Sequence, residues 1–134
     1  MSRSGYSEEC DRWALICWRG AVASSLRGVR GQRLLTDLRD ALKAMPVKEL
    51  IANELEADGK YCALGIVGCA RKIDMQGVNV EDSEEVARMF DISNAMAKEI
   101  VYMNDEYYYY PETNESRHAR MLAWVETKIS PAAT

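Results

Sequence analysis

Apolar residues recur at intervals of three and four along most of the chain, a pattern typical of helices that each bury one face. The clearest stripe lies in residues 32–45, where Leu34, Leu38, Leu42 and Met45 share one side. Comparable spacing predicts further helices at residues 8–26, 63–73, 82–90, 93–104 and 114–129. The pattern therefore predicts a mainly α fold of about five to six helices.

The first predicted helix has an apolar face of its own. Spacings of three and four place Trp13, Cys17, Ala21 and Ser24 on one side, with Cys10 one turn earlier. Because the apolar face of a helix is normally covered, we expect this side to be buried. The cysteines of the segment are then small core residues, since unpaired cysteine is among the most buried residue types.

The segment that follows the second helix fits two structures. Pro46 suits the first turn of a helix, and the apolar residues up to Leu55 follow helical spacing. Alternatively, the dipeptide Asp58-Gly59 is a hairpin signal that would pair a short strand with residues 60–63. The glutamates before the turn are poor strand formers, so we favour a helix at 47–57 and keep one small β-hairpin around Asp58-Gly59 as the alternative.

The segment DGKYCALGIVGCA, residues 58–70, joins this turn to an apolar run. A buried helix there would face the core with Leu64, Val67 and Ala70. Gly65 and Gly68 lie three residues apart on the same helix, where they would let another part of the backbone approach closely. We therefore expect close packing at the two glycines, and Gly65→Leu to unfold the domain.

Composition sets the class of the protein. At 134 residues, 48% of them apolar, the chain is long enough for a single domain, residues 1–134, with frayed ends expected at 1–6 and 130–134. No apolar run approaches the ~20 residues that a membrane span needs, and the first residues do not resemble a secretory signal. We expect a soluble protein of a reducing cytosol, where a disulfide framework is disfavoured.

The net charge of −4 is unevenly distributed. Residues 1–50 carry a net charge of +3, and residues 51–134 carry −7. Arg27, Arg30 and Arg33 surround a glycine turn and form a weak candidate for an anion-binding site. A solvated, basic helix end is the simpler interpretation, because these arginines lack the interleaved aromatic residues of a nucleic-acid surface.

The strongest candidate for a contact surface follows the fifth helix. Four consecutive tyrosines cannot all be buried with their hydroxyl groups satisfied, so some must reach the surface, where tyrosine is a favoured contact residue. A strand or loop with two rings buried and two exposed is the competing interpretation. The predicted partner-binding residues are Tyr107, Tyr108, Tyr109, Tyr110, Asp105, Glu106 and Glu112.

Two other function classes are considered. Residues 86–104 resemble a helix-turn-helix in spacing, but residues 81–106 carry eight acids against Arg88 and Lys98, which would repel DNA. A cysteine-dependent enzyme would need Cys62 as nucleophile and His118 as base, with Asp105 or Asn104 as the orienting group.

Metal chemistry has little support in the spacing. The cysteines Cys10 and Cys17, like Cys62 and Cys69, are seven residues apart, whereas zinc sites favour spacings of two to four. Binding zinc would require the two helices to meet face to face. We therefore predict no catalytic residue, no metal and no cofactor.

Several short motifs together resemble a family of small proteins of tailed bacteriophages and prophages, one with no known activity. They are RGQ at 30–32, AMP at 44–46, DGKYCALG at 58–65, MNDE at 103–106 and, near the end, ET, Arg117 and WVE. The resemblance covers nearly the whole chain. It departs at the tyrosine run and at His118, where tryptophan is usual in the family, which weakens the thiol-enzyme hypothesis.

The resemblance implies a context rather than a chemistry. Small phage proteins commonly bind another protein in the host, so we expect an accessory protein that is not an enzyme. Its partner would be a host or phage protein, and counter-defence inhibition is one form of that function. Nucleic acid and membrane are disfavoured as partners, and a homo-oligomer is left open. The acidic half would match a basic surface on the target.

Overall fold

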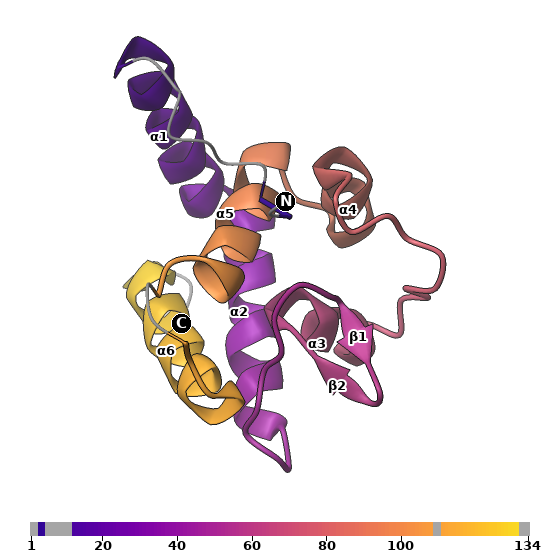
Figure 1. Ribbon diagram of the computed structural model, residues 1–134. Helices are drawn as coiled ribbons and strands as arrows, with labels where there is room; N and C mark the ends of the chain where they lie inside the picture. Colours follow the sequence, from indigo (N-terminus) through magenta and orange to yellow (C-terminus); the bar gives the residue numbers. More distant parts are fainter. Residues whose placement is uncertain (1–2, 5–11, 109–110, 132–134) are drawn as a thin grey trace.

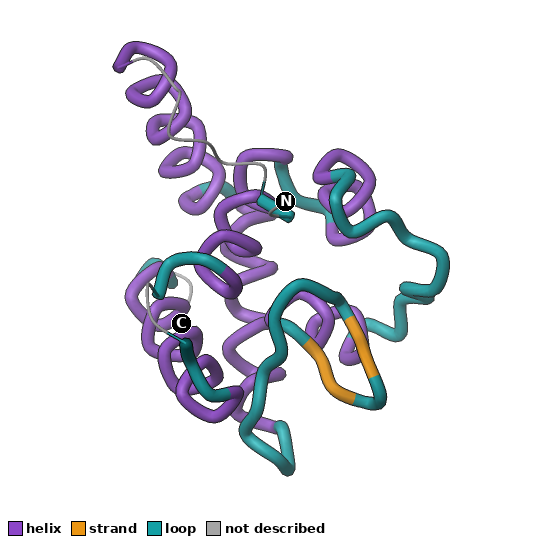
Figure 2. Tube along the Cα trace, in the orientation of Figure 1, coloured by secondary structure: helices purple, strands orange, loops and turns teal. Residues whose placement is uncertain are grey.

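The computed structural model describes residues 3–4, 12–108 and 111–131, and these residues form six α-helices and one small antiparallel sheet (Figures 1 and 2). The mainly α fold with a small hairpin is therefore confirmed. The helices are α1 (Arg12–Arg27), α2 (Val29–Ala44), α3 (Ala63–Ala70), α4 (Ser83–Phe90), α5 (Asn94–Asp105) and α6 (Asn114–Lys128), and the strands are β1 (Glu56–Ala57) and β2 (Lys60–Tyr61).

Helices α2 and α5 organise the core. α2 contacts α1, α3 and α6, while α5 contacts α1, α3, α4 and α6. The predicted stripe of α2 is confirmed, because Leu34, Leu38 and Leu42 are fully buried. On α5, Met96 and Ile100 are buried as well. Both helices carry apolar residues at helical spacing. Burying these residues requires packing on several sides, which places each helix between several others.

Helix α1 differs from its prediction. Trp13, Cys17, Ala21 and Ser24 are exposed, so the expectation that this face is buried is wrong for the single chain. On the opposite side, Val22 and Leu26 in the later turns pack against the body, whereas Leu15 near the start of the helix is 50% exposed. Figure 1 shows the first turns of α1 extending away from the other helices. Cys10 and the predicted start of the helix at Glu8 lie outside the described residues.

The segment before α3 forms the hairpin rather than the favoured helix at 47–57. Strand β1 pairs with β2, with Glu56 opposite Tyr61 and Ala57 opposite Lys60. Asp58 and Gly59, at the turn, have φ angles of 53° and 77°. These positive φ values are typical of the tight hairpin turns that the dipeptide predicts.

Hydrogen bonds to distant elements hold the extended segment that leads into the hairpin. The amide of Leu50 donates to the carbonyl of Asn114, and the amide of Ile51 donates to that of Tyr61. The amide of Cys62 donates to the carbonyl of Leu55 in the same way. Because these backbone donors and acceptors of the segment pair with groups outside it, the segment does not need helical hydrogen bonds, and helical spacing alone was misleading here.

Close backbone packing at Gly65 is confirmed. A Cβ atom at Gly65 would overlap the carbonyl oxygen of Leu55, so a larger residue would displace the segment that leads into β1. At Gly68 a Cβ atom would meet the side chain of Met75. Leu64 and Val67 face the core as predicted, but Ala70 is exposed because α3 ends there, before Ile73.

Side-chain caps begin the later helices where the sequence predicts them. Asp82 accepts the amide of Glu85 at 3.2 Å at the start of α4. Ser93 accepts the amide of Met96 at 3.0 Å at the start of α5. Each cap satisfies a backbone donor that has no partner within its helix, which explains why the two helices start at these residues.

The chain ends are held more firmly than predicted where they are described. Arg3 and Ser4 are buried, which corrects the expectation that residues 1–6 are frayed as a whole. Near the other end, the amide of Ser130 donates to Gln32 at 2.8 Å. No helix within the described ranges combines the length and the apolar character that crossing a membrane requires.

Candidate interaction surface

The tyrosine loop, residues 106–113 between α5 and α6, carries the predicted contact residues. Tyr107 and Tyr108 are 56% and 50% exposed, so this part of the tyrosine run does reach the surface. Tyr109 and Tyr110 lie outside the described residues. Two large rings with few rotatable bonds are therefore available to a partner at the end of α5.

Tyr107 is held in place despite its exposure. Its amide donates to the carbonyl of Tyr102 at 3.0 Å, and the two rings meet edge to face at a centroid distance of 6.4 Å. The guanidinium carbon of Arg120 lies 5.8 Å from the Tyr107 ring centroid, within the range of a cation–π contact. A ring that is already ordered loses less conformational entropy when a partner binds.

Two of the three predicted contact acids are inside the molecule. The Asp105 carboxylate accepts two hydrogen bonds of 2.7 Å from Arg3, and its side chain is 3% exposed. Glu112 accepts hydrogen bonds of 2.8 and 2.9 Å from Arg120 and is 4% exposed. Glu106, half-buried, accepts a hydrogen bond from the Ser4 hydroxyl. Asp105 and Glu112 are therefore not available to a partner, which corrects the expectation of an exposed acidic loop.

These groups belong to a larger buried cluster, which we call the arginine network. Its members are Arg3, Asn104, Asp105, Glu112, Arg117 and Arg120. Asn104 accepts the amide of Ala63 at 3.1 Å and donates to the carbonyl of Ile51 at 2.9 Å. Arg117 donates to the carbonyls of Asn104 and Leu50 at 3.1 and 2.9 Å. The network thus joins the N-terminal segment, the hairpin approach, α3, α5 and α6.

The network favours the charged form of its carboxylates. Burial by itself would raise the pKa of Asp105, but hydrogen bonds and charge from Arg3 outweigh it and hold that pKa below its ordinary value of 3.8. Hydrogen bonding from Arg120 lowers the pKa of Glu112 below 4.5 against the opposing effect of burial. Burial likewise opposes the charge of Arg3, yet Asp105 raises the pKa of Arg3 above its ordinary value. Both ion pairs are therefore charged at neutral pH.

The thiol-enzyme arrangement is not assembled. The Cys62 side chain is buried, and its sulfur accepts hydrogen bonds from the amide of Gly65 at 3.3 Å and from Arg3 at 3.7 Å. Nε2 of His118 lies 2.9 Å from the carbonyl oxygen of Leu42. Among the described residues, no hydrogen bond joins His118 to Cys62, Asn104 or Asp105. Cys62 acts as the N-cap of α3, a structural role.

The remaining described cysteines do not converge on a metal. Cys17 and Cys69 are both exposed, on α1 and α3 respectively. Figure 1 shows these two helices in separate parts of the molecule, so they do not meet face to face. Within the described ranges, no group of three or more histidine, cysteine or acidic side chains is placed to hold a metal ion. Cys10 lies outside those ranges.

The predicted anion site is partly neutralised within the chain. Arg30 and Arg33 lie 3.3 and 4.0 Å from the carboxylate of Asp91, and Arg27 is exposed on the last turn of α1. An anion would have to displace Asp91 from the two guanidinium groups. The observation favours the simpler interpretation of a solvated, basic helix end.

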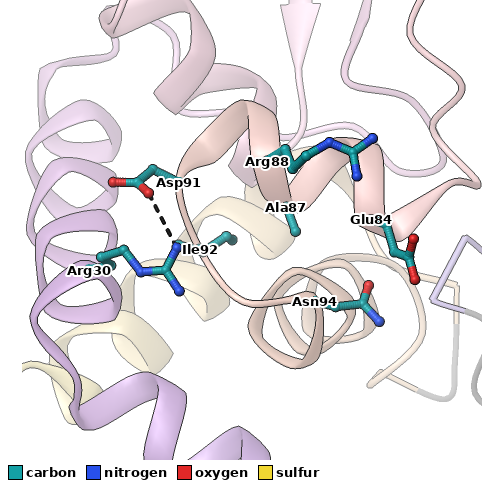
Figure 3. Close-up of a pocket in the computed structure, with 7 residues that line it drawn as sticks. All are labelled: Arg30, Glu84, Ala87, Arg88, Asp91, Ile92 and Asn94. Carbon is teal, nitrogen blue, oxygen red and sulfur yellow. Dashed lines mark hydrogen bonds and ion pairs between the residues drawn. The ribbon is translucent and has the colours of Figure 1, made fainter.

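An open groove of about 460 Å³ lies beside this ion pair (Figure 3). Its charged lining residues, Arg30, Arg88, Glu84 and Asp91, balance each other. The side-chain oxygen of Asn94 is buried there and accepts no hydrogen bond from the described residues. The groove is therefore better suited to hydrogen-bond donors than to an anion.

The helix pair α4–α5 occupies the position of the proposed helix-turn-helix. Eight of the twelve residues of α5 are buried, including Glu99 and Asn104. A helix that reads DNA must present one face to the major groove, free of the rest of its own domain. The burial of α5 is typical of a central core helix, and the acids of α4 add to the unfavourable charge.

Three exposed acids line a second groove, outside the tyrosine loop. This acidic groove, of about 560 Å³, lies between β1 and the loop that follows α3. Glu54, Glu56 and Asp74 supply negative charge, while apolar side chains such as Met75 and Val78 supply contact area. The sequence gives little sign of it, because its two walls are about 20 residues apart and only the hairpin brings them together.

Comparisons with known proteins add no relative: no family model, no curated protein and no solved structure matches the chain.

The arginine network was missed by sequence reasoning. Its one visible signal is the set of short motifs near residues 104, 112 and 117, which the fold brings together in space.

Proposed function

We propose that the chain is a small accessory protein of tailed-bacteriophage or prophage origin that binds a host or phage protein through Tyr107 and Tyr108. The exposure of both rings beside the buried arginine network is the observation that carries this proposal. Tyrosine gives a large contact area with little loss of side-chain entropy. The family resemblance supplies the context, a host-cell cytoplasm.

Charge adds a second element to the proposal. Asp105 and Glu112 are neutralised by arginines, so the acidic contribution comes from Glu54, Glu56 and Asp74 at the acidic groove. An acidic groove with apolar walls favours a partner segment that carries basic and apolar side chains. A counter-defence inhibitor would use such a surface to cover the basic nucleic-acid-binding site of a host enzyme.

The test is affinity capture from infected cells with three forms of the full chain. The wild type is compared with the double variant Tyr107→Ser/Tyr108→Ser and with Val47→Ser, which removes a comparably exposed apolar side chain, 62% exposed, from a different loop. We expect the captured partner to be lost with the tyrosine variant and kept with Val47→Ser. Identical capture by the wild type and the tyrosine variant would contradict the proposal.

A second measurement separates protein binding from DNA binding. A labelled DNA duplex should show no mobility shift with this chain at low salt, the condition that most favours non-specific binding. A shift that weakens steeply with added salt would replace the proposal by the nucleic-acid alternative. With the captured partner, Glu54→Lys/Glu56→Lys should slow association and reduce its salt dependence.

A further inference from the structure

Helix α1 presents an apolar face that nothing in the described chain covers. Trp13 and Ile16 are 73% and 55% exposed, and Cys17, Gly20, Ala21 and Ser24 on the same side are exposed as well. Val22 and Leu26, on the opposite side, anchor the helix to the body. A large exposed apolar face of this kind usually marks an interaction site.

The face is uncharged, with a large side chain at Trp13 and open space at Gly20. No charged residue interrupts it between Trp13 and Ser24, because Arg19 lies to one side and pairs with Glu99 at 2.9 Å. Trp13 and Gly20 are seven residues apart, which puts them on the same side of α1, about 10 Å from each other. A Cβ atom at Gly20 would have no atom within 4 Å, so the surface above this glycine is open.

We propose that α1 pairs in antiparallel orientation with α1 of a second copy of the chain, about a two-fold axis between Ile16 and Cys17. Trp13 and Gly20 are equally far from that axis along the helix. Each Trp13 ring would therefore lie over Gly20 of the other copy, and the two contacts would be identical by symmetry. With the axis at this point, each projecting ring meets the open surface of the other copy in an isologous contact, as a two-fold interface requires.

The available area supports a pair of modest stability. An aromatic side chain buries about 150–250 Å² when it is fully covered, and most of the Trp13 surface is open. Trp13 and Ile16, with the small exposed residues on the same side, supply part of the ~800 Å² per partner typical of a specific interface, so we expect a weak dimer. The absence of charge on the face removes the repulsion that two basic helices would otherwise have.

The first test is the oligomeric state of the full chain, measured by sedimentation equilibrium. We expect a dimer for the wild type and at least tenfold weaker association for Trp13→Ser and for Gly20→Leu. Lys43→Leu is the matched control, since it adds the same exposed leucine on α2 and should remain dimeric. Any non-specific apolar association would instead be strengthened by leucine at position 20.

The Gly20→Leu variant also separates pairing from folding. Its melting temperature, measured at a concentration where both forms are monomeric, should equal or exceed that of the wild type, because leucine favours helices more than glycine does. A wild-type chain that stays monomeric up to roughly 100 µM would overturn the proposal. A Gly20→Leu variant that associates as tightly as the wild type would also overturn it.

A second test locates the axis. In a Cys10→Ser/Cys69→Ser background, Cys17 is the only remaining cysteine described as exposed. A short bis-maleimide should then link two copies through Cys17, and the additional change Cys17→Ser should abolish the link. A dimer that gives no link through Cys17 would overturn the antiparallel pairing. The tyrosine variants should not affect this dimer, so the two proposals can fail separately.

Discussion

Helix α1 exposes apolar side chains, which are usually buried, whereas the arginine network buries charged side chains, which are usually exposed. In α1, Trp13 and Ile16 face solvent, whereas in the network charged side chains such as Asp105 and Arg117 are buried. The buried charges find their partners within the chain, through ion pairs and backbone carbonyls. The exposed apolar residues find none among the described residues.

The difference separates what stabilises the monomer from what is available for binding. A buried charge without partners costs several kcal/mol, so the network must be complete before the chain can fold stably. An exposed apolar face destabilises the folded chain little, and it becomes buried when a partner binds. Substitutions in the network should therefore change folding, whereas substitutions on α1 should change association.

The largest expected effect on stability comes from replacing a glycine in the body of the protein, compared with replacing one on α1. Gly65→Leu should unfold the domain, because the new side chain would overlap the Leu55 carbonyl and displace the segment that leads into β1. We expect a loss of at least about 3 kcal/mol from a total of roughly 5–15 kcal/mol. Circular dichroism during urea unfolding measures the loss. Gly20→Leu is the control, and a folded Gly65→Leu chain of normal stability would contradict the packing described here.

A second comparison uses two arginines. Arg117→Met should lower the free energy of unfolding by about 3–5 kcal/mol, because Leu50 and Asn104 lose a buried donor and Glu112 loses a neighbouring charge. Arg27→Met, at an exposed site, should change it by less than about 0.5 kcal/mol. Equal effects of the two substitutions in urea unfolding would show that the network does not stabilise the monomer.

The smallest expected effect concerns pH and the pair of Arg3 with Asp105. Because the pKa of Asp105 is lower in the folded chain, its ionisation stabilises the fold above about pH 4, and this contribution is lost as the pH falls through the folded pKa. Asp105→Asn should therefore cost about 1–3 kcal/mol at pH 7, less than Arg117→Met because the amide oxygen can still accept a hydrogen bond from Arg3, and the deficit should shrink below about pH 4. Thermal unfolding from pH 7 to pH 2.5 measures it, and a constant deficit would exclude the ion pair as its cause.

Much of the fold was predictable because it depends on local periodicity. The stripe of Leu34, Leu38 and Leu42 specified α2, and the caps Asp82 and Ser93 specified the starts of α4 and α5. These signals act within one or two turns of helix, so the order of residues reveals them directly. The hairpin was left open, because the spacing of apolar residues and the turn dipeptide favoured different structures.

The candidate site was less predictable, because exposure and pairing depend on contacts between distant residues. From the number of adjacent rings, the sequence indicated that some of the four tyrosines reach the surface, but not which ones; the structure exposes Tyr107 and Tyr108. It could not show that Asp105 and Glu112 are neutralised, since their partners Arg3 and Arg120 are known only once the chain has folded. It also could not reveal the acidic groove, whose walls meet through the hairpin.

The sequence by itself determined the helical class of this protein, most of its helix limits, its close-packed glycine at position 65 and the apolar character of α1. Only the tertiary structure decided which side of α1 meets the body and which carboxylates are neutralised by arginines. The physical reason is the range of the interactions: propensity, capping and periodicity act between neighbouring residues, whereas burial and ion pairing depend on which distant surfaces meet.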